Sequence, residues 1–462
     1  MIELLEIKKN WKVVKLDEVC DITSSKRIFQ HDYVGSGIPF FRTKEIKELS
    51  EGKDVSTELF ITKEKYNEIK GQFDIPKIGD ILISAVGTIG VSYIIKDNEP
   101  FYFKDGNLIW IKNLSKVDTK FLNYYLAHFV RFKQTIATSG SAYNALTIVK
   151  LKDFEIPLPS QIEQQQIVSK IEELFSELDK GIEELKTAQQ QLKVYRQAVL
   201  KWAFEGKLTE QWRVQQSELI EANELLKEIL ADKQKTLGKR AKPLMPITSE
   251  EMLSLPQLPQ TSMWVKLGDH AFVTKLAGFE FTKYVRYKAE GDVPVIRAQN
   301  VSKDSFIPRN FVFVDREIME QLPRSRVFGG EILMVFVGAG LGNVGIVPEK
   351  HEFFLGPNVA KIALEKQFSN KYVFYFLSSS LGFSNVTGMS KATAQGSISM
   401  ANIREVSVPL MSLEEQQQIV QEIESRLSVC DKIEETITNS LKQSEALRQS
   451  ILKKAFEGKL VP

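Results

Sequence analysis

One segment of this chain occurs twice. Residues 157–210 and 409–462 align without a gap, each residue with the one 252 positions later, and about half of the aligned positions are identical. The blocks EQQQIV and AFEGKL are unchanged between the two copies. A repeat on this scale indicates two consecutive halves, each of which ends in the same structural segment. This duplication restricts the fold more than any single motif in the sequence does.

The segments in front of the two copies are related more weakly. PFFRTKEI corresponds to PVIRAQNV, and GDILISAVGTIG corresponds to GEILMVFVGAGL. Short runs rich in Val and Ile, such as ILISAV and EILMVFV, predict strands. Aromatic and aliphatic residues at helical spacing predict one helix over 120–132 and one over 370–381. Each half therefore begins with an α+β domain of about 150 residues, which is large enough to hold its own core.

Each copy of the repeated segment is expected to be one long helix. In the first copy, apolar residues recur every seven positions on one seam, and a second seam follows three residues later. The first seam consists of Ile171, Leu178, Leu185, Leu192 and Val199, and the second of Leu174, Ala188, Tyr195 and Trp202, with Gly181 as a gap. The second copy presents Ile423, Cys430, Ile437, Ser444 and Ile451 on the equivalent face. Such a stripe over about five heptads is typical of a coiled coil, so the two helices are expected to pair with each other. The chain between them is long enough to allow either a parallel or an antiparallel pair.

The connector between the halves differs from both in composition. Residues 218–237 are predicted to be helical, and KRAKPLMP and LSLPQLPQ then bring basic residues and four prolines, which favour an extended, semi-rigid chain. The sequence thus predicts a first α+β domain at 1–156, a first helix at 157–208, the connector at 209–260, a second α+β domain at 261–408 and a second helix at 409–462.

Composition excludes several classes of protein. The chain has 462 residues, with 61 Lys and Arg against 59 Asp and Glu and only two cysteines, Cys20 and Cys430. Two cysteines cannot build a disulfide framework or a four-ligand zinc site, and the start MIELLEIKKN lacks the pattern of a signal peptide. The longest uncharged stretch, 372–390, holds five serines and two glycines and is a poor membrane span. We therefore expect a cytoplasmic protein that does not enter a membrane.

No catalytic or metal-binding set is apparent in the sequence. The four histidines lack the HExxH spacing, both GK pairs of AFEGKL are followed by Leu, and no GxSxG motif occurs. Gly340, Gly342 and Gly345 form GxGxxG, but the dinucleotide fingerprint requires a following helix, whereas NVGIVPEK predicts a strand. A β-hairpin turn is therefore the preferred interpretation. We expect no catalytic residue and no metal ligand in this chain.

Positive charge is concentrated on the two domains. The net charge is +2 for 1–156 and +4 for 261–408, against −2 for each of 157–260 and 409–462, as expected if the domains meet phosphates. Three loops at corresponding places in the two domains carry the side-chain types that reach phosphates and base edges. The candidate DNA-binding residues are Ser25, Lys26, Arg27, Arg42, Lys44, Ser139, Ser141, Tyr143, Asn144, Lys275, Arg297, Gln299, Asn300, Lys391, Thr393 and Gln395. Ordinary solvated loops are the alternative. Arg42 and Arg297 share one position in both halves, which is compatible with a structural or phosphate-binding role.

Two variable domains, each followed by a near-identical helix that opens with EQQQIV and closes with AFEGKL, resemble the specificity (S) subunit of type I restriction-modification systems. The resemblance covers essentially the whole chain. It implies that each domain is a target recognition domain for one half of a split, asymmetric DNA sequence, that the helices pair antiparallel as a spacer, and that the subunit has no activity of its own. The implied partners are double-stranded DNA, two methyltransferase (M) subunits and restriction (R) subunits. S-adenosylmethionine, ATP and Mg²⁺ would bind to those partner subunits and no cofactor to this chain.

The second helix departs from the first at three positions of its apolar face. Arg426, Ser440 and Ser444 stand where the first helix has Leu174, Ala188 and Leu192, which leaves part of the apolar face of the first helix free for a partner subunit.

Two other classes of function stay open. The first is a coiled-coil scaffold whose end domains bind protein, and such a scaffold would not bind DNA with a split motif. A stand-alone methyltransferase or nuclease would need an NPPY or PD…ExK motif, and neither occurs. The bases that are read depend on loop geometry and DNA shape, which the sequence does not disclose.

Overall fold

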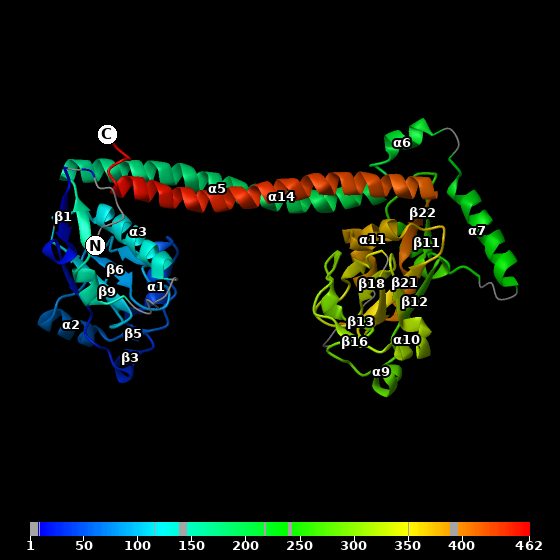
Figure 1. Cartoon of the computed structure of the whole chain (residues 1–462), viewed down its shortest axis with the longest axis horizontal. Helices are drawn as coiled ribbons and strands as arrows, with labels where there is room; N and C mark the ends of the chain where they lie inside the picture. The colour runs from blue at the N-terminus through cyan, green and yellow to red at the C-terminus, as the bar shows by residue number, and fades with distance from the viewer. Residues whose placement is uncertain are drawn as a thin grey trace. The chain divides into compact units, whose positions relative to one another are not determined.

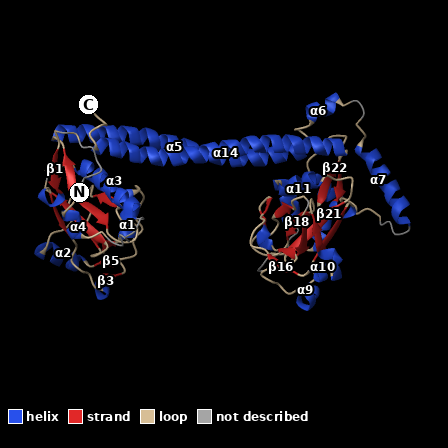
Figure 2. Cartoon of the chain, in the orientation of Figure 1, coloured by secondary structure: helices blue, strands red, loops and turns tan. Residues whose placement is uncertain are grey.

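The computed structural model describes residues 8, 10–114, 116–137, 146–216, 219–238, 243–349, 351–388 and 396–462. The chain divides into two compact units, which are described separately (Figures 1 and 2). Unit 1 consists of Met1–Lys186 and Ile437–Pro462, and unit 2 of Thr187–Thr436. Domain 1 (residues 1–156) lies in unit 1, and domain 2 (residues 261–408) lies in unit 2. The helices α5 (Gln161–Phe204) and α14 (Leu413–Phe456) each contribute to both units.

The two predicted long helices are present, have 44 residues each and pair with each other. In unit 1, the Arg448 side chain of α14 forms an ion pair with Asp179 of α5 and lies over the ring of Phe175, 4.4 Å from its centroid. In unit 2, the Arg196 Nη2 of α5 donates to the Asp431 Oδ1 of α14 at 2.6 Å. Residue numbers thus rise along α5 as they fall along α14, so the helices run antiparallel.

Most of the first seam of the predicted coiled coil is buried, whereas Leu178, Leu185 and Ser444 in its middle are only partly buried, and part of the second seam is exposed. Buried seam residues are Ile171, Leu192, Val199, Ile423, Cys430, Ile437 and Ile451. In the second seam, Tyr195 and Trp202 are 38% and 36% exposed, and their rings contact each other. The reason is that Arg426 faces this part of the seam. Its guanidinium pairs with Glu422 at 3.1 Å, and the nearby Tyr195 hydroxyl and Glu422 carboxylate raise the pKa of Arg426, so this stretch of the seam is polar.

Domain 1 is built on two four-stranded sheets (Figure 2). The first has the order β2 (Cys20–Thr23), β9 (Leu108–Asn113), β6 (Ile81–Ser84) and β7 (Ser92–Ile94), all antiparallel. The second has the order β3 (Tyr33–Val34), β5 (Phe60–Ile61), β4 (Ile38–Phe41) and β8 (Tyr102–Phe103), in which β4 and β8 are parallel. The remaining elements are β1 (Lys12–Lys15), which pairs with β10 (Glu155–Leu158), and the helices α1 (Thr43–Ser50), α2 (Lys63–Gln72), α3 (Thr119–Ala137) and α4 (Ile148–Lys152).

Domain 2 has the same first sheet and shares three neighbouring strands of the second, but the fourth strand of its second sheet lies at the opposite edge. Its first sheet has the order β12 (Ala271–Lys275), β21 (Val359–Leu364), β18 (Ile332–Val335) and β19 (Val344–Ile346). Its second has the order β16 (Val312–Val314), β13 (Val293–Ile296), β20 (Glu352–Leu355) and β17 (Arg326–Phe328), in which β13 and β20 are parallel as β4 and β8 are. The other strands are β11 (Met263–Lys266), paired with β22 (Ser407–Leu410), and β14 (Val301–Ser302), paired with β15 (Ser305–Phe306). Its helices are α9 (Gly278–Tyr284), α10 (Arg316–Gln321), α11 (Asn370–Ser378), α12 (Ser380–Thr387) and α13 (Met400–Glu405).

The repeated block AFEGKL fastens each long helix to a domain. In unit 1, the ring of Phe456 is fully buried, with centroids 5.4 Å and 5.1 Å from those of Phe121 and Tyr125 in α3. In unit 2, Phe204 packs in the same way against Tyr372 and Phe376 of α11. The same ring therefore anchors both helix ends, which explains why the block is unchanged between the copies.

Two local predictions in domain 2 have opposite outcomes. The GxGxxG stretch is a hairpin turn as predicted, since β18 and β19 on either side of it are antiparallel and Gly342 has a φ of 81°. The single helix predicted over 370–381 is wrong. Ser379 has an extended backbone and accepts the Gly382 N–H on its Oγ at 3.1 Å, which ends α11 and caps α12.

The connector carries more helix than the sequence predicted. The helix α7 (Ala222–Leu237) begins four residues later than predicted, and two short helices, α6 (Glu210–Gln215) and α8 (Ser249–Ser254), were not predicted. The start of α8 is fixed by a reciprocal cap, in which the Thr248 hydroxyl accepts from Glu251 N and the Glu251 carboxylate accepts from Thr248 N. The α7 helix packs apolar side chains on the core of unit 2, and its Lys233 pairs with Glu365 at 2.9 Å.

Candidate nucleic-acid interface

The loop after β2 buries one of its three predicted DNA-binding residues and exposes the other two. Ser25 is 8% exposed. The Lys26 backbone N–H donates to the Tyr102 hydroxyl at 2.7 Å, and its Nζ lies 4.2 Å from the ring centroid of Phe73. The Arg27 side chain is 70% exposed and pairs with Asp105 at 3.0 Å. The loop is thus anchored at Ser25 and Lys26 and offers the Arg27 guanidinium to a ligand.

Arg42 and Arg297 occupy the same structural position, directly before the helix that follows the parallel strand. The Arg42 N–H donates to the Glu45 carboxylate at 2.8 Å, and the Arg297 N–H donates to Asn300 Oδ1 at 3.0 Å. Each residue therefore begins a helical turn that is closed by the residue three positions later: α1 in domain 1 and the one-turn helix η5 (Ala298–Asn300) in domain 2. This shared cap is a structural reason for the likeness of PFFRTKEI and PVIRAQNV.

The Arg42 guanidinium is committed to a buried carboxylate. Its Nη2 lies 2.9 Å from Glu45 Oε1, and Glu45 is fully buried. This hydrogen bond raises the pKa of Arg42. Burial alone would raise the pKa of Glu45, but the hydrogen bonds from Arg42 outweigh it, and the pKa is lowered. Lys44, two residues on, is half exposed and contacts Glu48 at 3.8 Å.

In domain 2, the corresponding side chains hold a loop in place. Arg297 Nη2 and Gln299 Nε2 both donate to the Asn310 carbonyl, at 2.8 Å and 3.2 Å. Asn300 is fully buried and donates to the carbonyls of Ile307 and Arg309. Asn300 thus has a structural role, whereas Arg297 and Gln299 lie at the surface beside it.

Of the remaining predicted DNA-binding residues, one lies within the described part of the structure and seven lie outside it. Lys275 ends β12, and its Nζ lies 4.9 Å from the ring centroid of Phe336. The predicted residues Ser139, Ser141, Tyr143, Asn144, Lys391, Thr393 and Gln395 lie outside the described residues. The geometry therefore locates the first two loops of each domain and leaves the third as a sequence prediction.

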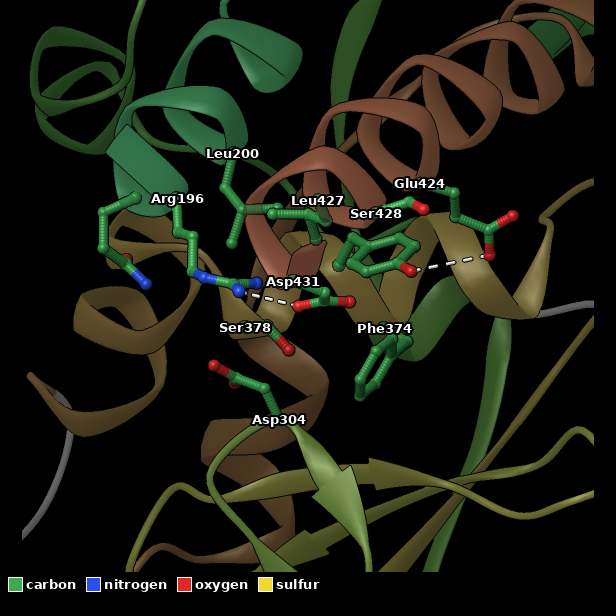
Figure 3. A pocket seen from close by; sticks show the side chains of 11 residues that line it. Arg196, Leu200, Asp304, Phe374, Ser378, Glu424, Leu427, Ser428 and Asp431 are labelled. Atoms are coloured by element: carbon green, nitrogen blue, oxygen red, sulfur yellow. Dashed lines mark hydrogen bonds and ion pairs between the residues drawn. The ribbon is translucent and has the colours of Figure 1, made fainter. Parts of the chain in front are cut away.

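A cavity of about 420 Å³ in unit 2 lies where domain 2 meets the helix pair (Figure 3). Arg196 and Asp431 from the helices form one ion pair on its wall, and the Tyr375 hydroxyl donates to Glu424 at 3.5 Å. Burial raises the pKa of Tyr375 to about 12, and the neighbouring Glu424 adds to this. Because these polar groups bind one another across the junction, we interpret the cavity as the joint between domain 2 and the helices.

The described residues contain neither a cluster of metal ligands nor a membrane-spanning helix. Across these ranges, no group of three or more His, Cys, Asp or Glu side chains is placed to hold a metal ion. Within the same part of the chain, no helix combines the length and the apolar character needed to cross a membrane.

The comparisons with known proteins agree with this architecture. The family model "Type I restriction modification DNA specificity domain" matches residues 8–187 and 259–443, so the chain belongs to this family. A putative type I restriction enzyme specificity subunit of Haemophilus influenzae is 34% identical over 206 residues, which cover 44% of this chain and 51% of that protein. The chain thus spans about half the length of that relative. The EcoBI specificity subunit of Escherichia coli is 26% identical over 463 residues, which cover 99% of this chain and 88% of that protein.

Solved structures share the fold. A chain from a structure described as the basis of complex assembly and conformational transition of the type I R-M system has a TM-score of 0.64 at 17% identity and covers 98% of this chain and 99% of its own. The HsdS subunit from Thermoanaerobacter tengcongensis has a TM-score of 0.53 at 17% identity, with 98% of each chain covered. The predicted fold class, two α+β domains joined by two long antiparallel helices in an internal repeat, is confirmed.

Proposed function

We propose that this chain is the DNA specificity subunit of a type I restriction-modification complex and that it reads a bipartite, asymmetric DNA target. One observation carries this proposal: two domains that share their first sheet and three strands of the second present different side chains at corresponding loops, Lys44 in one and Gln299 in the other. A shared scaffold with unlike loops suits two unlike half-sites. The membership in the specificity family supports the same function.

We infer that the predicted loops contact DNA through their exposed side chains. The best-placed candidates are Arg27, Lys44 and Lys275, which can neutralise phosphates, and Arg297 and Gln299, which have the donor groups that reach base edges. The third loop of each domain, around Ser139 and Lys391, adds to this set on the sequence prediction alone. Phosphate contacts set position and affinity, whereas base contacts set sequence.

We further propose that the paired helices set the distance between the two half-sites. Each helix has 44 residues at about 1.5 Å per residue. Half-sites about one turn of DNA apart, ~34 Å, present their major grooves on the same face of the duplex. Joining two weak readers in one chain also raises affinity through effective concentration.

The catalytic steps are proposed to belong to partner subunits. Two methyltransferase subunits and restriction subunits would bind S-adenosylmethionine, ATP and Mg²⁺, and this chain would bring them to DNA in the cytoplasm without chemistry of its own. Apolar side chains that the helix pair of unit 2 leaves exposed offer a docking surface: Val194 at 71%, Val429 at 55% and Ile433 at 44%.

An exchange of domains tests the proposed function. The chain is co-expressed with its methyltransferase subunit, and the modified bases are mapped across a genome. Replacing residues 1–156 with the corresponding domain of a relative should change one half of the methylated motif, and replacing 261–408 should change only the other half. A change in both halves, or in neither, would contradict modular reading. Loss of binding as salt rises is expected, because phosphate contacts release counterions.

A further inference from the structure

An exposed pair of stacked rings stands at the start of a one-turn helix in domain 1. This helix, η2 (Gln30–Asp32), follows β2, and its cap residue is Phe29. The Phe29 N–H donates to the Asp32 carboxylate at 3.0 Å, which closes the turn. The rings of Phe29 and His31 stack with centroids 5.7 Å apart and planes at 3°. Phe29 is 55% exposed and the His31 side chain 80% exposed, so the pair stands in solvent.

Domain 2 has an exposed ring on a helix that is capped in the same way. Here α9 follows β12, and its cap residue is Ala277. The Ala277 N–H donates to the Glu280 carboxylate at 3.1 Å, and Arg324 holds that carboxylate at 2.8 Å. Phe279 projects from this turn and is 69% exposed.

The two rings correspond in the fold although they do not correspond in the alignment. Counted from the cap residue, both His31 and Phe279 are the second helical residue, and the third supplies the carboxylate that closes the cap. The cap residue follows the end of β2 by six positions but the end of β12 by two, so a sequence comparison does not pair them. In unit 2, α9 lies at the end of domain 2 that is away from the helix pair (Figure 1). In unit 1, β3, which directly follows η2, lies at the end of domain 1 that is away from the helix pair.

The surroundings of these rings combine rigidity with positive charge. The caps fix the backbone that carries each ring, so the rings are presented in a set orientation. Lys26 and Arg27 precede the domain 1 pair, and Lys283 lies one helical turn after Phe279 in domain 2. An apolar ring beside cations fits duplex DNA, since the cations meet phosphates and the ring can enter between base pairs. A single exposed apolar residue needs no explanation, but an exposed ring at the same helical position of two diverged domains, His31 in one and Phe279 in the other, does.

We propose that Phe279 in domain 2 and the Phe29–His31 pair in domain 1 are wedges, each of which presses into a base step of the half-site that its domain contacts. This inference rests on the proposed function. Because pyrimidine–purine steps unstack most readily, a wedge favours half-sites that contain such a step without a hydrogen bond to any base. The wedges are thus residues that determine specificity through their shape, and a search of the sequence for charged or hydrogen-bonding side chains does not find them.

The test uses this chain in complex with its methyltransferase subunits and a duplex that carries the methylated motif. The fluorescent base 2-aminopurine replaces an adenine at each pyrimidine–purine step in turn, and its emission rises when the base unstacks. The wild-type complex should brighten the probe at one step of each half-site. Phe279→Ala should lower affinity by about 5- to 150-fold, the range for an aromatic ring that stacks on a base, and should abolish the signal in one half-site only. Phe279→Trp should retain both.

Two control variants separate a wedge from other roles. Phe272→Ala removes a ring that is 52% exposed on β12 of the same domain, and it should leave affinity and probe signal unchanged. Lys283→Ala should reduce the slope of log affinity against log salt concentration by about one, the value for one lost phosphate contact, and the probe should still brighten. Phe279→Ala should leave that slope unchanged.

The outcomes distinguish the inference from the proposed function. Wild-type affinity and wild-type probe signal in Phe279→Ala would overturn the wedge. A wild-type complex that binds the motif tightly without brightening any probe would overturn it as well. If the wild-type complex shows no preference for a split motif, the proposed function itself fails.

Discussion

One glutamate occurs in both copies of the EQQQIV block but meets two different environments. In unit 2, Glu415 is 1% exposed and accepts from Arg213 Nη1 at 2.7 Å, Thr209 Oγ1 at 3.1 Å and Thr261 Oγ1 at 3.2 Å. In unit 1, Glu163 is 16% exposed, and its ion-pair partner is Lys8 at 3.1 Å, itself 32% exposed. The same residue therefore allows a buried and a half-exposed ion pair to be compared within one chain.

Removing each cation should have very different costs. Arg213→Ala leaves the Glu415 carboxylate buried without its charged partner, which typically destabilises by about 3–5 kcal/mol. The two threonine hydroxyls remain and offset part of this, so we expect about 3 kcal/mol. Lys8→Ala exposes Glu163 to water, and the loss should be about 0–1 kcal/mol. The double variant Arg213→Leu with Glu415→Leu removes both charges and should recover most of the loss.

Hydrogen exchange, followed for each peptide of the protein, can measure the loss of stability in each variant. A loss of about 3 kcal/mol corresponds to a factor of roughly 150 in the opening equilibrium of peptides from α6 and the start of α14. The peptides around Glu163 should change by less than about fivefold in Lys8→Ala. Equal losses in the two single variants, or a double variant as unstable as Arg213→Ala, would refute the reasoning that burial decides the cost.

Three further expectations follow from the structure. Phe204→Ala should destabilise unit 2 by about 3–5 kcal/mol in urea unfolding because it empties a buried site against Tyr372, whereas Val194→Ala, 71% exposed on the same helix, should stay within about 0.5 kcal/mol. Burial lowers the pKa of His270 to about 4, and nearby Lys233 adds to this, so the unfolded chain takes up the proton first. Stability should therefore fall as pH drops from about 6.5 to 4, and His270→Gln should flatten that slope. Inserting seven residues after Leu185, with a matching insertion in α14, should lengthen the unread spacer of the methylated motif, and an unchanged spacer would remove the proposed ruler role.

Periodic patterns in the sequence were reliable where burial repeats along an element. The seven-residue spacing predicted two paired helices, and the burial of Ile171, Leu192 and Val199 confirms it. The pattern was wrong at Tyr195 and Trp202, because spacing marks a face and does not say which residue stands opposite. The polar Arg426 stands there, 231 positions after Tyr195 in the chain.

Local chemistry was harder to predict than periodicity. The apolar spacing over 370–381 predicted one helix, but serine is a preferred cap residue, and Ser379, one of three consecutive serines in this stretch, ends the first helix and caps the next. Arg42 illustrates the same point for the candidate site. A basic residue at a strand end suggested phosphate binding, but its guanidinium is held by the buried Glu45 three residues on.

The sequence by itself determined the duplication, the pairing of two long helices and the α+β character of both domains. These features come from repetition and from the spacing of apolar residues, which are properties of the linear chain. Only the tertiary structure decided which loop side chains are committed and which are exposed: Asn300 is buried, Arg27 faces solvent, and His31 and Phe279 take corresponding positions. The physical reason is that burial and hydrogen-bond partners depend on segments far away in the chain and on loop lengths, neither of which leaves a periodic signal.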